Sequence, residues 1–258
     1  MAQLLIGMVL FAELIAAGNG PMGSVPESEL DLKKGIEELR QGQQAMRTDL
    51  MDIKSLLGRM AGPGVPQTDV KGMEFELGGN PVRGSGAAKL LLVEFTDYQC
   101  PHCGRYVRET FPLISERYVD TGLVQYAVYN RPLSIHRMAA KAAEASHCAN
   151  AQGRFWEMHR LVMAQQGTLD DLSSYADVLD LDRAQFEDCL KSNKYREQVE
   201  KEEAVARKLG MTGVPGFVIA KVDPHNPAKA HAIASIKGAQ PFPIFQKEID
   251  RALTAPGD

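Results

Sequence analysis

Several kinds of residue are scarce in this chain of 258 residues, and each scarcity excludes something. The formal net charge is only −4, from 29 Lys and Arg against 33 Asp and Glu, and no basic patch with interleaved aromatics occurs, so nothing indicates nucleic-acid binding. Cysteine is limited to four residues, and only Cys100 and Cys103 are neighbours in the sequence. A structural zinc site usually takes two such pairs, or one pair with closely spaced histidines, so no metal site is expected.

Long apolar runs are also missing, apart from residues 4–17, which are too few to cross a bilayer comfortably. This run resembles the hydrophobic part of a signal peptide followed by small residues. No Lys or Arg precedes it and Glu13 interrupts it; a start codon placed too late would account for the missing basic residues. We expect residues 1–20 to be a signal peptide, with an uncleaved membrane anchor as the alternative.

The most informative feature that is present is the motif Cys100-Pro101-His102-Cys103. Two thiols separated by two residues can close a small, strained disulfide that exchanges with thiols of other proteins. Residues 90–95 form an almost continuous apolar run typical of a buried strand, and the residues after the motif have helical spacing up to about Gly122. With a second strand over 123–129, the pattern predicts a βαβ unit that carries the motif at its strand-to-helix turn.

This placement has a chemical consequence for the two thiols. The unpaired N–H groups and the dipole at a helix N-terminus favour an anion, which lowers the pKa of Cys100. Pro101 suits the first helical position because it needs no donor there, and His102 adds a donor and, when protonated, a positive charge. We therefore expect Cys100 to be the exposed nucleophile and Cys103 the more buried resolving thiol.

The motif after a strand that ends in Glu94-Phe95 resembles the DsbA-type thiol-disulfide oxidoreductases of the thioredoxin superfamily. The resemblance implies that Glu94, six residues before Cys100, is a buried acid that accepts the proton of the resolving thiol. The alternative is a solvated Glu at the strand end. Val214-Pro215 matches the cis-proline loop of the family, which packs against the dithiol and pairs with the substrate chain.

The order of the remaining elements also fits this family. Residues 217–222 and 232–237 have the pattern of two strands, and 242–252 that of a closing helix. The stretch 134–209 matches the helical insertion that distinguishes the family from plain thioredoxins. The expected fold is therefore α/β, a thioredoxin fold with a helical insertion over residues 73–258.

Cys148 and Cys189 both fall within this insertion. An even number of cysteines in an oxidising compartment favours a structural disulfide between them. Closing a loop of about 41 residues would stabilise the fold by roughly 4 kcal/mol in the chain-entropy model. Two buried free thiols, acting as small apolar residues, are the alternative.

A coiled coil is predicted ahead of this domain, because a/d heptads continue through four repeats. Leu at a with Ile at d shifts the preference away from dimers, so we expect a trimer first and a dimer second. The alternative is a helix that folds back on its own catalytic domain. We expect an oligomerisation helix over 21–61, acting through residues 30–60, and a Pro- and Gly-containing linker over 62–72. The a and d positions are Leu32, Ile36, Leu39, Gln43, Met46, Leu50, Ile53, Leu57 and Met60.

This architecture resembles the oligomeric, ScsC-like relatives of DsbA. It implies a periplasmic disulfide oxidase, isomerase or both, without a cofactor, that acts on unfolded or wrongly disulfide-bonded exported proteins and is reset by a membrane redox partner. The dithiol motif favours oxidation, whereas several active sites around one substrate favour isomerisation. The alternatives are a copper-tolerance protein that binds Cu(I) through the same thiols, and a structural envelope protein.

Overall fold

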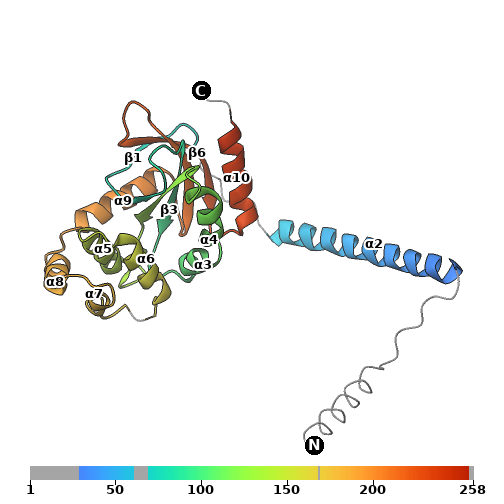
Figure 1. Cartoon of the computed structure of the whole chain (residues 1–258), viewed down its shortest axis with the longest axis horizontal. Helices are drawn as coiled ribbons and strands as arrows, with labels where there is room; N and C mark the ends of the chain where they lie inside the picture. Colours follow the sequence, from blue (N-terminus) through green and yellow to red (C-terminus); the bar gives the residue numbers. More distant parts are fainter. Residues whose placement is uncertain (1–28, 61–68, 168, 256–258) are drawn as a thin grey trace, which may run out of the picture. The chain divides into compact units, whose positions relative to one another are not determined.

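The computed structural model describes residues 29–60, 69–167 and 169–255 (Figure 1). Contacts between residues divide the chain into two units, 1–67 and 68–258. The predicted signal peptide at 1–20 lies outside the described residues, as does most of the predicted linker. The first unit is therefore described by a single helix, α2 (Glu29–Met60).

Helix α2 carries the predicted heptads. Gly35 and Gly42 each weaken a helix by roughly 1 kcal/mol, and isolated helices depend on packing of an apolar face for most of their stability. The apolar side chains described on it are nonetheless exposed, by 54% at Leu32, 72% at Leu39 and 65% at Met46. The side chains of the heptad positions from residue 50 onward lie outside the described residues, and the oligomer stays a prediction.

The second unit is built on a six-stranded sheet with the order β1-β6-β5-β3-β4-β2. The central strand β3 (Leu90–Thr96) is buried along its whole length, which explains its continuous apolar run. It pairs in parallel with β4 (Val124–Asn130) and antiparallel with β5 (Gly216–Val222), and β6 (Lys229–Lys237) follows β5. The edge strands β1 (Glu74–Glu76) and β2 (Val82–Arg83) were not predicted, because two or three residues are too few to show alternation.

The single helix predicted after the dithiol is divided into three consecutive segments. These are α3 (Pro101–Glu109), α4 (Phe111–Ile114) and the π-helical turn η1 (Ser115–Val119). Pro112 has no backbone N–H and therefore cannot donate the hydrogen bond that would continue α3. At the division, the Thr110 hydroxyl donates to the carbonyl of Gln240 at 3.3 Å. The helical segments end at Val119, and β4 begins at Val124.

The described residues of the predicted insertion form five helices, which are α5 (Ala139–Asn150), α6 (Phe155–Ala164), α7 (Ser174–Val178), α8 (Arg183–Lys191) and α9 (Arg196–Lys208). Figure 1 groups α5 to α8 beside the sheet. Cys148 on α5 and Cys189 on α8 form a disulfide with a Cα–Cα distance of 5.9 Å. Buried apolar side chains from all five helices form one cluster together with the two dithiol cysteines, so the insertion packs directly against the motif. The last described helix is α10 (Phe242–Thr254).

Candidate active site

The dithiol lies at the junction between β3 and α3. Cys100 is the N-cap of α3 with extended backbone angles, φ −78° and ψ 117°, and Pro101 takes up the start of the helix. The N–H of Cys100 donates to the carbonyl of Asp97 at 3.1 Å, which closes the turn after the strand. Both Cys100 and Cys103 are free thiols. The local placement is the one that the βαβ pattern predicts.

The two thiols have opposite electrostatic environments. A hydrogen bond from the Cys103 thiol, helped by the backbone N–H groups of Cys103 and His102, lowers the pKa of Cys100 to about 6. Burial raises the pKa of Cys103, and so do Cys100 and Glu94 beside it. The ring of His102 is exposed, so within the structure this residue contributes through its backbone.

The expectation that Cys100 is exposed is wrong. Its accessible fraction is 5%, against 0% for Cys103. Its sulfur contacts the carbonyl oxygen of Val214 at 3.7 Å, and its own carbonyl accepts a hydrogen bond from Gln166. A helix N-terminus is usually open to solvent, but here two segments distant in sequence cover it.

Glu94 is completely buried within β3, which rules out the alternative of a solvated side chain. Burial raises its pKa to about 7, against smaller opposing effects from the hydroxyls of Thr96 and Tyr126. Tyr126 donates a hydrogen bond to Oε2 of Glu94. Oε1 has no hydrogen-bond partner among the described residues. A carboxyl group with a pKa near neutrality can both accept and return a proton, as acid–base chemistry requires.

The loop that contains Pro215 lies against the dithiol. The Val214–Pro215 peptide bond is cis, and the Val214 carbonyl accepts from the Cys100 thiol. A side chain at position 216 would meet the Met211 sulfur at 3.1 Å and the Gly213 carbonyl at 3.3 Å, so Gly216 lets the loop fold tightly before β5. The structure thus brings the predicted residues Cys100, Cys103, Glu94, Val214 and Pro215 together from three separate segments.

Asp97 belongs to this site but was not singled out from the sequence. Its buried carboxylate accepts hydrogen bonds from the backbone N–H groups of Gln99 and Leu133, both at 2.7 Å, and lies 2.8 Å from Nδ1 of His136. The side chain of Gln99 in turn accepts from the N–H of Met138 at 2.5 Å. These bonds fasten residues 131–138 to the turn before Cys100. In the sequence Asp97 resembles an ordinary turn residue.

Gln166, which follows α6, was missed for the same reason. Its Nε2 donates to the Cys100 carbonyl at 2.8 Å, which connects the insertion to the first turn of α3. A Cβ at position 104 would clash with Oε1 of Gln166. Gly104 therefore leaves room for this side chain.

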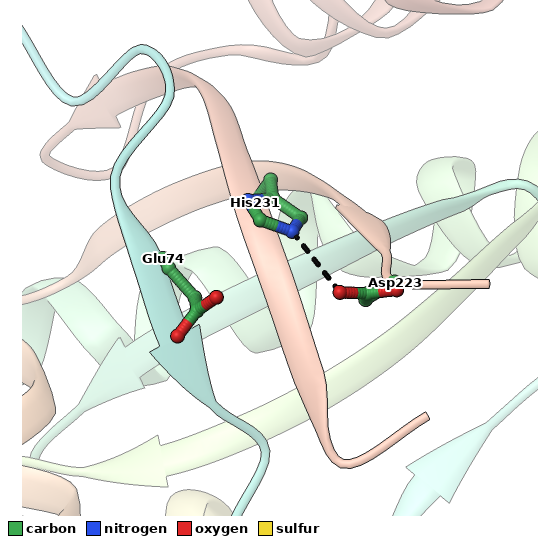
Figure 2. A group of neighbouring side chains, drawn as sticks. All are labelled: Glu74, Asp223 and His231. Carbon is green, nitrogen blue, oxygen red and sulfur yellow. Dashed lines mark hydrogen bonds and ion pairs between the residues drawn. The ribbon is translucent and has the colours of Figure 1, made fainter. Parts of the chain in front are cut away.

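One group of potential metal ligands occurs among the described residues, and it lies away from the dithiol. Glu74, Asp223 and His231 place ligand atoms within 4.8 Å of one another (Figure 2). Asp223 follows the end of β5 opposite to Pro215. Glu74 already pairs with the ammonium of Lys229 at 2.7 Å, and Asp223 accepts two backbone N–H groups, so each carboxylate has its partners without an ion.

The thioredoxin family model matches residues 76–236, which are more than half of the chain. The chain belongs to the thioredoxin family. Among solved structures it is similar to α-DsbA1 of Wolbachia pipientis, with 27% identity and a TM-score of 0.57 over 68% of this chain and 91% of that one. This similarity confirms the predicted fold and the resemblance to DsbA-type proteins.

Curated relatives match part of this chain. A Rickettsia typhi protein provisionally named a protein-disulfide oxidoreductase is 25% identical over 153 residues, which are 56% of each chain. The Na(+)/H(+) antiporter NhaA 3 of Salinispora tropica is 34% identical over 157 residues, 60% of this chain and 24% of the antiporter. The chain thus spans between a quarter and about half of these relatives. No helix in the described part of the chain has the length and apolar character needed to cross a membrane.

Proposed function

We propose that this protein catalyses thiol-disulfide exchange with exported proteins. The observation that carries the proposal is the asymmetry of the dithiol. Cys100, at the start of α3, has its pKa lowered to about 6, whereas burial raises the pKa of Cys103. At neutral pH the first sulfur is a thiolate and the second a thiol, which are the states of an attacking and a resolving group.

The reaction runs in two steps. In the oxidising direction, a substrate thiolate attacks Cys100 of the closed disulfide; the Cys100–Cys103 bond breaks, a mixed disulfide forms, and Cys103 leaves and takes up a proton from Glu94. A second substrate thiolate then attacks the substrate sulfur, and Cys100 leaves as a stable thiolate. A leaving thiol with a low pKa departs faster, so the lowered pKa of Cys100 favours oxidation of the substrate.

Substrate binding is assigned to the loop of Val214 and Pro215. Its backbone already reaches the Cys100 sulfur, so an extended substrate segment beside this loop would present a cysteine at the reacting atom. Pro101 and His102 lie exposed on the first turn of α3, where they border the same approach. The residues of the loop would then influence which substrates are accepted.

The site of action is proposed to be the periplasm, with a membrane redox partner that resets the dithiol. The disulfide between Cys148 and Cys189 supports this compartment, because such bonds persist mainly in oxidising surroundings. Sequencing the N-terminus of the mature protein from fractionated cells tests whether residues 1–20 are removed on export. A mature chain found in the cytoplasm with its N-terminus intact would argue against this proposal.

Self-association through α2 is proposed to set the balance between oxidation and isomerisation. The exposed Leu32, Leu39 and Met46 form an apolar stripe at heptad spacing, and a second or third copy would bury it. Several dithiols held around one substrate raise the effective concentration of the second attacking thiol.

Light scattering tests the assembly, and a monomer mass would exclude it. If residues 72–258 alone reactivate scrambled ribonuclease as well as the full chain does, the helix is not the cause of isomerisation.

Trapping the mixed disulfide tests the catalytic proposal most directly. In Cys103→Ser the resolving thiol is gone, so a covalent complex with a disulfide-bonded substrate should accumulate and disappear on reduction. In the matched control Cys100→Ser no complex should form, because the remaining buried thiol is protonated. Equal trapping by both variants would overturn the assignment. A chain that traps nothing but binds Cu(I) tightly would favour the copper alternative.

A further inference from the structure

Tyr126 is a buried titratable residue that the reaction above does not use. It lies on β4 opposite Leu92 of β3, two positions before the partner of Glu94 in the same parallel pairing. Its accessible fraction is 0%, and its ring packs against Phe111 at 4.3 Å and Trp156 at 5.8 Å between centroids. These contacts restrain the ring, so its hydroxyl is held at a defined place beneath the dithiol.

The hydroxyl makes the two oxygens of the Glu94 carboxyl group different. Tyr126 donates to Oε2, whereas Oε1 is buried without a hydrogen-bond partner among the described residues. Burial raises the pKa of Tyr126 well above its ordinary value, so the phenol keeps its proton and acts only as a donor to the carboxylate. Oε1 is then the oxygen that is free to take a proton.

We propose that Tyr126 is a positioning residue for the dithiol, whose hydroxyl holds Oε2 of Glu94 so that Oε1 exchanges the proton of Cys103. This inference rests on the proposed thiol-disulfide exchange. In the resolving step the S–H bond of Cys103 breaks and an O–H bond forms at Oε1. The Cys103 thiolate then attacks Cys100 in the mixed disulfide, a Cys100–Cys103 bond forms, and the partner sulfur leaves as a thiolate with its electron pair.

The hydrogen bond also sets when Glu94 can act as a base. Burial raises the pKa of Glu94, and the charge of Cys100 raises it further, whereas the hydroxyl of Thr96 and then that of Tyr126 lower it, because a donor to a carboxylate favours its charged form. Without the hydroxyl the carboxyl group would hold its proton to higher pH, and less of it would be available as a base near neutrality. Tyr126→Phe removes the hydroxyl and leaves the ring and its packing.

The test separates attack from resolution by stopped-flow reaction of the full reduced chain with dithiodipyridine. Attack by Cys100 releases one pyridinethione and leaves a mixed disulfide, and attack by Cys103 on Cys100 then releases the second. In Tyr126→Phe the first phase should be unchanged. The pH midpoint of the second phase should rise by about one unit, which at pH 7 slows this phase about fivefold.

Tyr129→Phe is the matched control. Tyr129 lies on the same strand, is equally buried, and donates to the carbonyl of Glu76 at 3.1 Å, but it packs in the cluster on the other face of the sheet. It should lose stability without a change in the pH midpoint. In the Glu94→Gln background, Tyr126→Phe should have no further effect on the second phase, because the titrating group is gone.

The outcomes separate this inference from the proposed function. If the wild-type chain releases only one pyridinethione or none, the exchange proposal itself fails. If it releases both and the pH midpoint of the second phase in Tyr126→Phe equals that of the wild type, exchange stands and the role of Tyr126 is refuted. An equal shift in Tyr129→Phe, or a shift that persists in the Glu94→Gln background, would likewise refute it.

Discussion

Replacing Glu94 by Gln should stabilise the protein at alkaline pH. The side chain is completely buried, and burial raises its pKa to about 7 from an ordinary value of 4.5. Gln keeps the shape and an oxygen for the Tyr126 hydroxyl, but it carries no charge. The substitution therefore removes the cost of holding a carboxylate in the interior and leaves the packing in place.

The size and the pH window follow from the two pKa values. Between pH 4.5 and pH 7 the native state keeps a proton that the unfolded chain has released, so the free energy of unfolding falls as the pH rises. With 1.36 kcal/mol for each unit, the loss amounts to about 3 kcal/mol above pH 7. Glu94→Gln should match the wild type near pH 4 and exceed it by about 3 kcal/mol at pH 8, or by about 6 to 12 °C in Tm.

The wild type and Glu94→Gln are both reduced, and their thermal unfolding is followed by circular dichroism from pH 4 to pH 9. This measures the difference in stability. The control is Glu202→Gln, because Glu202 is equally buried but accepts from the Asn130 N–H at 2.6 Å and lies 2.7 Å from Nε2 of His147. Losing a partnered carboxylate should destabilise the fold. A Glu94→Gln protein no more stable than wild type at pH 8 would refute the reasoning.

Three further predictions concern single contacts. Replacing both Cys148 and Cys189 by Ala should lower the free energy of unfolding by about 4 kcal/mol, from their separation of 41 residues; a loss below about 1 kcal/mol in urea titrations would contradict the chain-entropy estimate. Alkylation of Cys100 by iodoacetamide should have a midpoint near pH 6, whereas a midpoint near the ordinary thiol value of about 8.5 would show an unperturbed sulfur. Gly104→Ala should displace Gln166 and cost about 1 kcal/mol, as should Gln166→Ala. The two together should cost no more than one alone, and additive losses would contradict this coupling.

The elements that determine the reactive turn could be predicted from the sequence because their signals are local. The apolar run of β3, the two cysteines and Pro101 are close together in the sequence, and each favours its local backbone conformation without a distant partner. The burial of Glu94 was predicted from the resemblance to a family, because its spacing from Cys100 alone is equally compatible with a solvated side chain. The division of the helix at Thr110 was not predicted from Pro112, because a proline near a helix start is tolerated.

The contacts of Asp97, Gln166 and Tyr126 could not be predicted in this way. Their partners lie at His136, Cys100 and Glu94, between 32 and 66 residues away in the chain. Hydrophobic periodicity reports which face of an element is buried, but it does not report which polar side chain meets which. Such pairings depend on strand order and on how the insertion packs, and both are properties of the whole domain.

Local sequence signals are enough to predict that two thiols lie at the start of a helix after a buried strand, and that an apolar heptad stripe precedes the domain. The same placement also predicts which thiol attacks and which resolves, but the burial of Cys100 and the groups that surround each sulfur depend on the folded domain. Cys103 is covered by the insertion and lies near the buried Glu94, whereas Cys100 accepts from N–H groups in the first turn of α3 and donates to the Val214 carbonyl. The reason is that a pKa depends on burial and on distances through space, which spacing along the chain does not contain.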